Sequence, residues 1–168
     1  MSDPVPPFPT IAEAGRLIAR KKLSPVELTR FLLKRIEAID PRLHAFLLVT
    51  DKAALAAARA AEKAVMAGGK GPLLGIPVAY KDIYETAGVR TTAHSRILID
   101  NVPKQDAETV RRLHGAGAIM LGKLATHEFA IGGPATDLPW PPALNPWDTR
   151  RFTGGSSSGA GAAIAAGL

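Results

Sequence analysis

Segments with helical spacing of apolar residues alternate with short apolar runs along this chain, and this alternation most constrains its fold. Four segments have helical spacing, and they cover residues 10–20, 25–39, 51–67 and 107–114. Three short runs are typical of strands, and they cover residues 45–49, 76–83 and 118–121. Strands that alternate with helices predict an α/β fold, in which helices flank a mixed, partly parallel central sheet.

The first two predicted helices begin with capping signals. Thr10 and Glu13 have the spacing of a capping box, in which each side chain accepts a hydrogen bond from a backbone N–H that the helix leaves unpaired. Ser24 is followed by Pro25, and proline suits the first helical position because the N–H that it lacks has no partner there. These signals predict where the two helices start.

Composition limits the classes of function. The 168 residues, 46% hydrophobic and 21% charged, suit one soluble globular domain. The net charge is +6, but the basic residues are spread along the chain, so we expect no nucleic-acid partner. The chain has no cysteine and therefore no disulfide or thiolate ligand. The proline-rich residues 1–10 lack the apolar region of a signal peptide, and no apolar run is long enough to span a bilayer. We therefore expect a cytoplasmic protein without a membrane partner.

The stretch TGGSSSGAGAAIAAGL, at the end of the sequence, places three serines between glycines and follows them with small residues. Gly154 and Gly159 have the outer spacing of a Walker loop, but Ala160 and Gly161 stand where that loop needs a lysine and a hydroxyl. A dinucleotide-binding turn is also incomplete, because Ile164 occupies the position of its third glycine. We therefore expect no nucleotide cofactor.

Two further interpretations of the three serines stay open. Residues 155–159 match the GxSxG pattern of a serine ester hydrolase with Ser157 in the centre, although no histidine or acid follows them. On a purely structural interpretation, the small residues let a helix pack closely against the sheet, and Ser156 caps that helix. Residues 132–153, which precede the serines, are predicted to form a long functional loop in which residues 150–153 make a poor strand.

An activated serine needs a base, and the histidines give that role little support. His44, His114 and His127 lie in or beside predicted helices among ordinary polar neighbours, whereas His94 is a candidate to line a site. No pair of histidines has metal-ligand spacing, so we expect no metal. Lys81 is the other candidate base, because the apolar residues of a predicted strand lead directly into it.

Three blocks of the sequence resemble the amidase signature family and occur in the family's order. The blocks are GPLLGIPVAYKD with the TAG and TT that follow it, residues 71–92; a segment with GAGA, LGK and EFA, residues 106–130; and NPWD followed by GGSSSG, residues 145–159. The resemblance runs collinearly from about Ser24 to Leu168. The chain departs from the family at Thr153, where proline is frequent, and at Ser158, where glycine is frequent.

The resemblance implies an amidase that cleaves a carboxamide C–N bond with a Ser-Ser-Lys triad and no cofactor. Lys81 aligns with the family lysine that acts as the base. Ser156 aligns with the bridging serine, whose peptide bond to the preceding glycine the family holds in the cis form. The nucleophilic serine and the oxyanion hole of the family come later, beyond Leu168. The positions that the resemblance implies as lining the site are Gly132, Gly133, Gly155 and Ser157.

On this hypothesis residues 1–168 are the N-terminal portion of a single amidase signature domain whose sheet is incomplete, and this fragment alone is inactive. The expected partner is a small-molecule amide substrate, and a homodimer stays open. Two alternatives also stay open. One is the serine ester hydrolase of the GxSxG type, and the other is a non-catalytic subunit or binding module, for instance in an amidotransferase assembly.

Lysine can act as this base only when it is neutral. An ordinary lysine has a pKa near 10.4, and bringing that value to about 7 means disfavouring the ammonium by roughly 4 to 5 kcal/mol. Removal from water can supply a shift of that size. We therefore predict that Lys81 lies in a dry pocket within proton-relay distance of Ser156.

Overall fold

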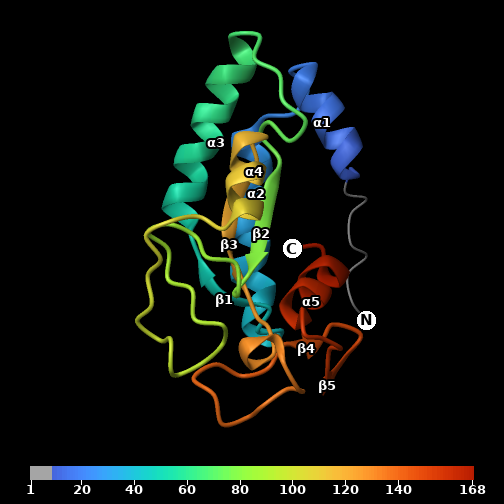
Figure 1. Cartoon of the computed structure of the whole chain (residues 1–168). Coiled ribbons are helices and arrows are strands. Elements are labelled where there is room, and N and C mark those ends of the chain that lie inside the picture. Colours follow the sequence, from blue (N-terminus) through green and yellow to red (C-terminus); the bar gives the residue numbers. More distant parts are fainter. Residues whose placement is uncertain (1–8) are drawn as a thin grey trace.

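The computed structural model describes residues 9–168 of the chain, so most of the N-terminal segment that was predicted to hold no signal peptide, residues 1–8, lies outside the described residues. Helices surround a small sheet in one half of the molecule, and a hairpin with the last helix lies in the other half (Figure 1). In chain order the elements are α1 (Ile11–Ala19), α2 (Pro25–Ile39), η1 (Asp40–Arg42), β1 (Phe46–Val49), α3 (Asp51–Met66), β2 (Pro77–Lys81), α4 (Glu108–Gly115), β3 (Ile119–Leu124), η2 (Glu128–Ala130), β4 (Leu144–Asn145), β5 (Asp148–Phe152) and α5 (Ser158–Ala166).

The central sheet has three strands in the order β1-β3-β2. Strand β3 runs antiparallel to β1 and parallel to β2, so the predicted mixed sheet flanked by helices is confirmed. Phe46 of β1 and Lys81 of β2 both pair with Leu124, the last residue of β3. The carboxyl ends of the two parallel strands therefore lie side by side, and Lys81 is at that end.

The predicted helix starts are confirmed. Thr10 is the N-cap of α1, where its hydroxyl accepts from the Glu13 N–H at 3.2 Å and the Glu13 carboxylate accepts from the Thr10 N–H at 2.7 Å. Ser24 is the N-cap of α2, and its hydroxyl accepts from two backbone N–H groups of the first turn. Each bond satisfies a donor that the helix itself leaves unpaired.

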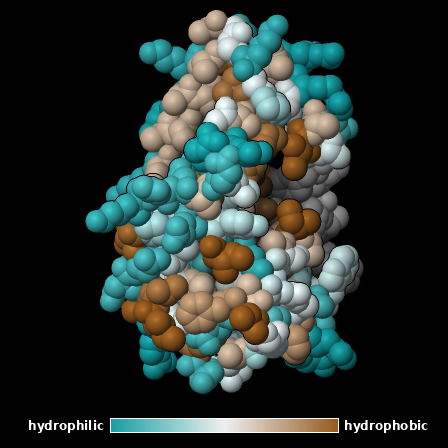
Figure 2. Space-filling view, in the orientation of Figure 1, coloured by the Kyte–Doolittle hydropathy of each residue, from teal (hydrophilic) through white to brown (hydrophobic). Residues whose placement is uncertain are grey.

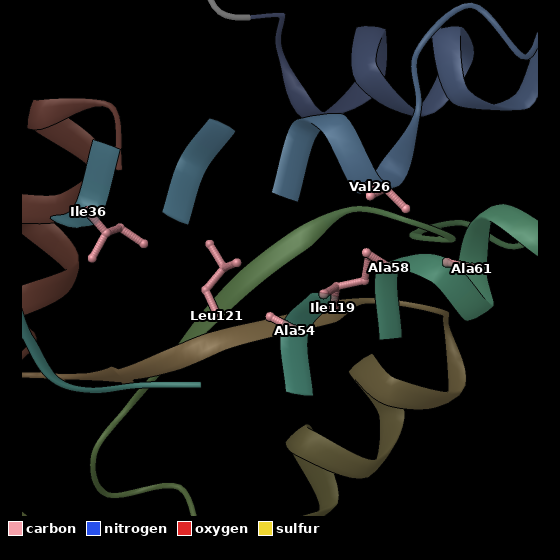
Figure 3. Packing of buried hydrophobic residues seen from close by; sticks show 7 residues of the cluster. All are labelled: Val26, Ile36, Ala54, Ala58, Ala61, Ile119 and Leu121. Carbon is pink, nitrogen blue, oxygen red and sulfur yellow. The ribbon is translucent and has the colours of Figure 1, made fainter. Parts of the chain in front are cut away.

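Helices α2 and α3 pack together against strand β3 and form the largest group of buried apolar side chains (Figure 3). Alanines provide the α3 side of this contact, so the helix lies close to the strand. The members of the cluster are Val26, Ile36, Ala54, Ala58, Ala61, Ile119 and Leu121. Helix α4 contacts the sheet elsewhere, where the His114 ring meets the Tyr80 ring edge to face at 5.8 Å. None of the helices in residues 9–168 combines the length and the apolar character needed to cross a bilayer.

Helix α5 packs against the ends of β1 and β3 through its small residues. A Cβ at Gly159 would lie 2.3 Å from the Ala45 carbonyl oxygen and 2.5 Å from the Ala125 nitrogen, both of them backbone atoms that cannot give way. The Gly159 N–H donates to the Ala125 carbonyl at 2.9 Å. The expected close packing of a small-residue helix on the sheet is therefore confirmed.

The predicted long loop at residues 132–153 is only partly correct. It contains the hairpin β4–β5, so the expectation that residues 150–152 would not form a strand was wrong. Strand β5 is largely exposed, and without a buried face its sequence shows no alternation of apolar and polar residues. Local bonds hold the turn instead, since Asn145 Oδ1 accepts from the Trp147 N–H at 3.0 Å and Asp148 accepts from Arg150 at 2.9 Å.

One strand boundary also differs from the prediction. The strand predicted at 118–121 continues to Leu124 as β3, because its polar residue Lys123 is buried among acceptors rather than marking a loop.

The loop between β2 and α4 exposes apolar side chains such as Ile97 and Val102. Figure 2 shows hydrophobic patches on the part of the surface that this loop occupies in Figure 1.

Candidate active site

The structure brings Lys81 and Ser156 into contact, although 75 positions separate them in the sequence. Lys81 Nζ lies 2.6 Å from Ser156 Oγ, a hydrogen-bond distance. Lys81 ends β2, and Ser156 lies in the glycine-flanked turn just before α5. The peptide bond between Gly155 and Ser156 is cis.

Lys81 is held at the end of its strand by the neighbouring backbone. The Asp82 N–H donates to the Leu124 carbonyl at 2.9 Å, and the chain then turns with a bond from the Tyr84 N–H to the Lys81 carbonyl at 3.0 Å. The Lys81 side chain is partly buried, and this burial lowers the pKa of its ammonium from the ordinary value. The direction is the one that a lysine base requires, because removal from water disfavours the charged form.

Ser156 does not cap helix α5, so the structural interpretation was wrong at this residue. The N-cap is Ser157, which is exposed and makes no side-chain capping bond. The Ser156 hydroxyl contacts Lys81 instead. The lysine is therefore aimed at Ser156 rather than at Ser157, the central serine of the GxSxG pattern.

His127 had no predicted role, and the structure places it directly against the serine turn. The His127 N–H donates to the Ser156 carbonyl at 3.0 Å. Its ring lies where a side chain at Gly155 would begin, since a Cβ there would be 2.3 Å from Nε2. On its other side, Nδ1 is 2.9 Å from the Gly132 carbonyl oxygen. His127 lies three residues after the end of β3, and its contacts with Gly155 and Ser156 are distant in the sequence, so no local signal identifies it.

The four predicted lining residues differ in their placement. Gly155 adjoins Ser156, and Gly132 reaches the turn through the ring of His127. Gly133 is exposed, and a Cβ on it would meet nothing within 4 Å. Ser157 is also exposed. The structure thus gathers Gly132 and Gly155 around His127 and leaves Gly133 and Ser157 without such a contact.

A second lysine, Lys123, is fully buried beside the end of β2. Its ammonium donates to the Tyr84 carbonyl, to Thr91 Oγ1 at 2.8 Å and to Thr86 Oγ1 at 3.3 Å. An oxygen of the Asp82 carboxylate lies 3.6 Å from Nζ. Burial lowers the pKa of Lys123, while the Asp82 charge acts in the opposite direction. All three N–H groups of this ammonium therefore have an acceptor.

The Asp82 carboxylate ties the loop after β2 to the sheet. Its second oxygen accepts from the Thr92 N–H at 2.9 Å and from the Thr92 hydroxyl at 2.6 Å. The Asp82 carbonyl accepts from the Ala93 N–H at 2.9 Å. Because Asp82 follows Lys81 directly, these bonds fix the backbone from which the Lys81 side chain projects.

His94, the candidate for a site-lining residue, binds backbone groups with both ring nitrogens. Nδ1 accepts from the Thr126 N–H at 3.3 Å, and Nε2 lies 3.1 Å from the Trp140 carbonyl oxygen. The side chain is buried. Its role in the structure is to connect the loop after β2, the end of β3 and the segment that leads to the hairpin. Within residues 9–168, no three histidine, aspartate or glutamate side chains come together as metal ligands.

Known proteins are similar to this chain in both sequence and fold. A family model described as Amidase matches residues 27–168. The A subunit of the glutamyl-tRNA(Gln) amidotransferase of Geobacter metallireducens is 50% identical over 157 residues, which cover 94% of this chain and 32% of that protein. A solved chain from a vestigial protein complex that reveals the evolutionary origins of an s-triazine catabolic enzyme has a TM-score of 0.89 and 38% identity, covering 95% of this chain and 35% of its own.

A bacterial aryl acylamidase described as belonging to the amidase signature enzymes has a TM-score of 0.85 and 29% identity, over 94% of this chain and 33% of its own. The chain thus spans about a third of the length of the relatives that it matches. The similarity includes the strand end with Lys81 and the turn with Ser156, since both fall within the matched residues 27–168.

Proposed function

This chain belongs to the amidase signature family, and on that premise we propose that it provides the lysine and the bridging serine of an enzyme that hydrolyses a carboxamide C–N bond. One observation carries the proposal: Lys81 Nζ lies 2.6 Å from Ser156 Oγ at the carboxyl end of β2. A hydroxyl in that position can pass a proton to an amine on one side and receive one from a nucleophile on the other.

In the proposed reaction Ser156 relays a proton from the nucleophile to Lys81 and later relays it from Lys81 to the leaving amine. The hydroxyl of a nucleophilic serine forms a bond to the amide carbon, its proton moves to Ser156 Oγ, and the Ser156 proton moves to Lys81 Nζ. The C–N bond then breaks as the ammonium returns its proton to Ser156 and the Ser156 proton passes to the leaving amine. Water attacks the resulting ester by the same relay, which yields the carboxylate and restores the serine.

The electrostatics of Lys81 support this role. The relay begins only if Lys81 is neutral, and its burial lowers the pKa of the ammonium. Lys81 Nζ bonds to the hydroxyl of Ser156, and this hydroxyl can act as donor or acceptor as the proton moves. A carboxylate in that place would instead hold the proton on the lysine.

We further propose that residues 1–168 are the N-terminal portion of a single amidase signature domain, with the nucleophile and the oxyanion hole beyond Leu168. The length comparison supports this, because the relatives are about three times as long as their match to this chain. On this proposal the 168 residues alone do not turn over an amide. An assay of the isolated chain tests that part directly.

The central test is Lys81→Ala in the polypeptide that continues past Leu168. We expect amide hydrolysis to fall by about 10²- to 10⁴-fold, the usual contribution of a positioned proton acceptor. Lys52→Ala is the matched control, because Lys52 is an exposed lysine on α3. Near-normal turnover of an amide by Lys81→Ala would remove the basis of the proposal.

The name of the relative with 50% identity, the A subunit of an amidotransferase, supports a more specific proposal. We propose that the amide is cleaved within an assembly that transfers the released ammonia. In that case ammonia release depends on partner subunits that copurify with the protein. Full amide hydrolysis by a protein that purifies without partners would favour a free amidase instead.

A further inference from the structure

We propose that His127 is the positioning residue that holds Ser156 against Lys81, and that its ring is the reason why position 155 is a glycine. The inference rests on the proposed function only in treating the Lys81–Ser156 contact as a proton relay. The residues involved are contributed by the ends of β2 and β3 and by the turn before α5.

The end of β3 forms a common frame for both members of the relay. Leu124 accepts from the Asp82 N–H and so fixes the residue next to Lys81. Three residues after Leu124, the His127 N–H donates to the Ser156 carbonyl at 3.0 Å. The two reacting side chains are therefore positioned by backbone bonds to one short segment.

The orientation of the His127 ring follows from its partner. The group 2.9 Å from Nδ1 is the Gly132 carbonyl oxygen, which can only accept a hydrogen bond. Nδ1 is therefore the nitrogen that carries a proton in this bond. Nε2 is buried and has no hydrogen-bond partner in the described part of the chain, and it faces Gly155. The contact between Nε2 and Gly155 is therefore one of packing and not a hydrogen bond.

Any side chain at position 155 would have to displace the His127 ring. The three atoms nearest to an added Cβ would be Nε2 at 2.3 Å, Cε1 at 2.4 Å and Cδ2 at 2.9 Å, all in His127. The φ angle of Gly155 is not positive, so this angle does not itself demand glycine. The neighbouring Gly154 has nothing within 4 Å of the same position and serves as a natural control.

The consequence for the relay is geometric. The His127 ring contacts Gly155 and the His127 backbone N–H binds the Ser156 carbonyl, so both contacts hold the 155–156 turn beside the end of β3. A displacement of about 1 Å is enough to cost about 10²-fold in rate for a group that must be in reach of its partner. His127 thus acts through Ser156 and does not itself need to touch the substrate.

The experiment combines Gly155→Ala and His127→Ala in the 168-residue chain and measures the nuclear Overhauser effect between the Lys81 ε-methylene and Ser156 β-methylene protons. In the unchanged chain the effect is expected, because Nζ and Oγ are 2.6 Å apart. Gly155→Ala is expected to abolish it, and His127→Ala to weaken it. With the ring removed, Gly155→Ala should cause no further loss. The control Gly154→Ala should retain the full effect.

Three results would overturn the inference. One is a full effect in Gly155→Ala, and another is a full effect in His127→Ala. The third is that Gly155→Ala reduces the Overhauser effect as much in the His127→Ala variant as it does in the unchanged chain. His127→Asn is the conservative rescue, because its amide N–H can replace the Nδ1 donor to Gly132. It should retain more of the effect than His127→Ala, and equal loss in the two variants would contradict the positioning role.

A measurement on the unchanged chain covers the case in which Gly155→Ala does not fold. Long-range nitrogen–proton correlation spectra of His127 should show the proton on Nδ1, and a proton on Nε2 would contradict the proposed orientation. None of these readouts needs turnover. Failure of the Lys81→Ala assay would therefore refute the hydrolase proposal while leaving the His127 contact to be judged on its own spectra.

Discussion

Lys81 and Lys123 lie on adjacent strands of one small sheet, and burial lowers the pKa of both ammonium groups. They differ in their partners. Lys123 is fully buried among two threonine hydroxyls, a backbone carbonyl and the Asp82 carboxylate, whereas Lys81 is partly buried and contacts the hydroxyl of Ser156. The comparison teaches that the hydrogen-bond partners of a buried lysine, together with the depth of its burial, decide what the lysine can do.

The acceptors around Lys123 favour an ammonium group that keeps all of its protons. Removing a proton from its ammonium would leave a buried oxygen without a donor and Asp82 without its counter-ion, and both changes are costly in a protein interior. Lys81 has a partner that donates as readily as it accepts, so its proton can leave without leaving an unpaired group. One lysine is thus suited to hold the strand end in place and the other to exchange a proton there.

The largest predicted effect is on stability and separates the two lysines. Lys123→Met should lower the free energy of unfolding by about 3–5 kcal/mol, because it leaves the Asp82 carboxylate buried without its counter-ion. Lys81→Met should cost about 1 kcal/mol, the net value of one hydrogen bond. Urea unfolding of both variants, followed by circular dichroism, measures the difference.

The matched control for this prediction is Lys123→Met combined with Asp82→Asn. Replacing both charges should be less destabilising than Lys123→Met alone, since no unpaired charge stays buried. Equal losses in Lys123→Met and Lys81→Met would show that the two lysines do not differ in the way that their contacts suggest.

The second predicted effect concerns the link between Asp82 and the loop after β2. Thr92→Val removes the 2.6 Å bond from the Thr92 hydroxyl to the carboxylate, together with the acceptor of the His94 N–H at 3.1 Å, and should cost about 1.5–3 kcal/mol, the usual range for a bond to a charged group. Valine keeps the shape of the side chain, so the loss reports the hydroxyl. Thr10→Val at the exposed N-cap of α1 is the comparison, with an expected loss of about 1 kcal/mol. A smaller loss at Thr92 than at Thr10 would contradict the importance of the Asp82 network.

The sequence was sufficient for the parts of the fold that have a repeating pattern. The helices α1, α2, α3 and α4 and the strands β1 and β2 were predicted within a few residues, because their apolar residues recur at the spacing of a buried face. The hairpin β4–β5 was missed because an exposed strand has no such pattern. The last residues of β3 were missed because the buried Lys123 looks like a loop residue until its acceptors, distant in the sequence, are known.

The site residues, too, could be predicted where a sequence motif marks them and not where only the folded chain brings them together. Lys81 and Ser156 were selected from motifs, and the structure places them 2.6 Å apart. His127 was set aside because its contacts, Gly132, Gly155 and Ser156, meet it only after the chain has folded. No local pattern around a histidine reports which glycine will lie under its ring. Long-range juxtaposition of this kind is the information that spacing along one chain does not carry.

The smallest predicted effect is the pH dependence that Lys81 contributes to stability. Its folded-state pKa is lowered by burial from the value near 10.4 of an exposed lysine. Between those two values the unfolded chain binds more protons than the folded chain, so the free energy of unfolding rises with pH across this window. Lys81→Met should remove that rise and leave a flatter profile.

Nuclear magnetic resonance titration of the Lys81 ε-carbon should give a midpoint below about 10.4. Because burial is the cause, Ser156→Ala should leave the midpoint below the ordinary value. A midpoint at or above that value in the unchanged chain would show that Lys81 is as hydrated as a surface lysine, and the contrast with Lys123 would then lie in exposure rather than in partners.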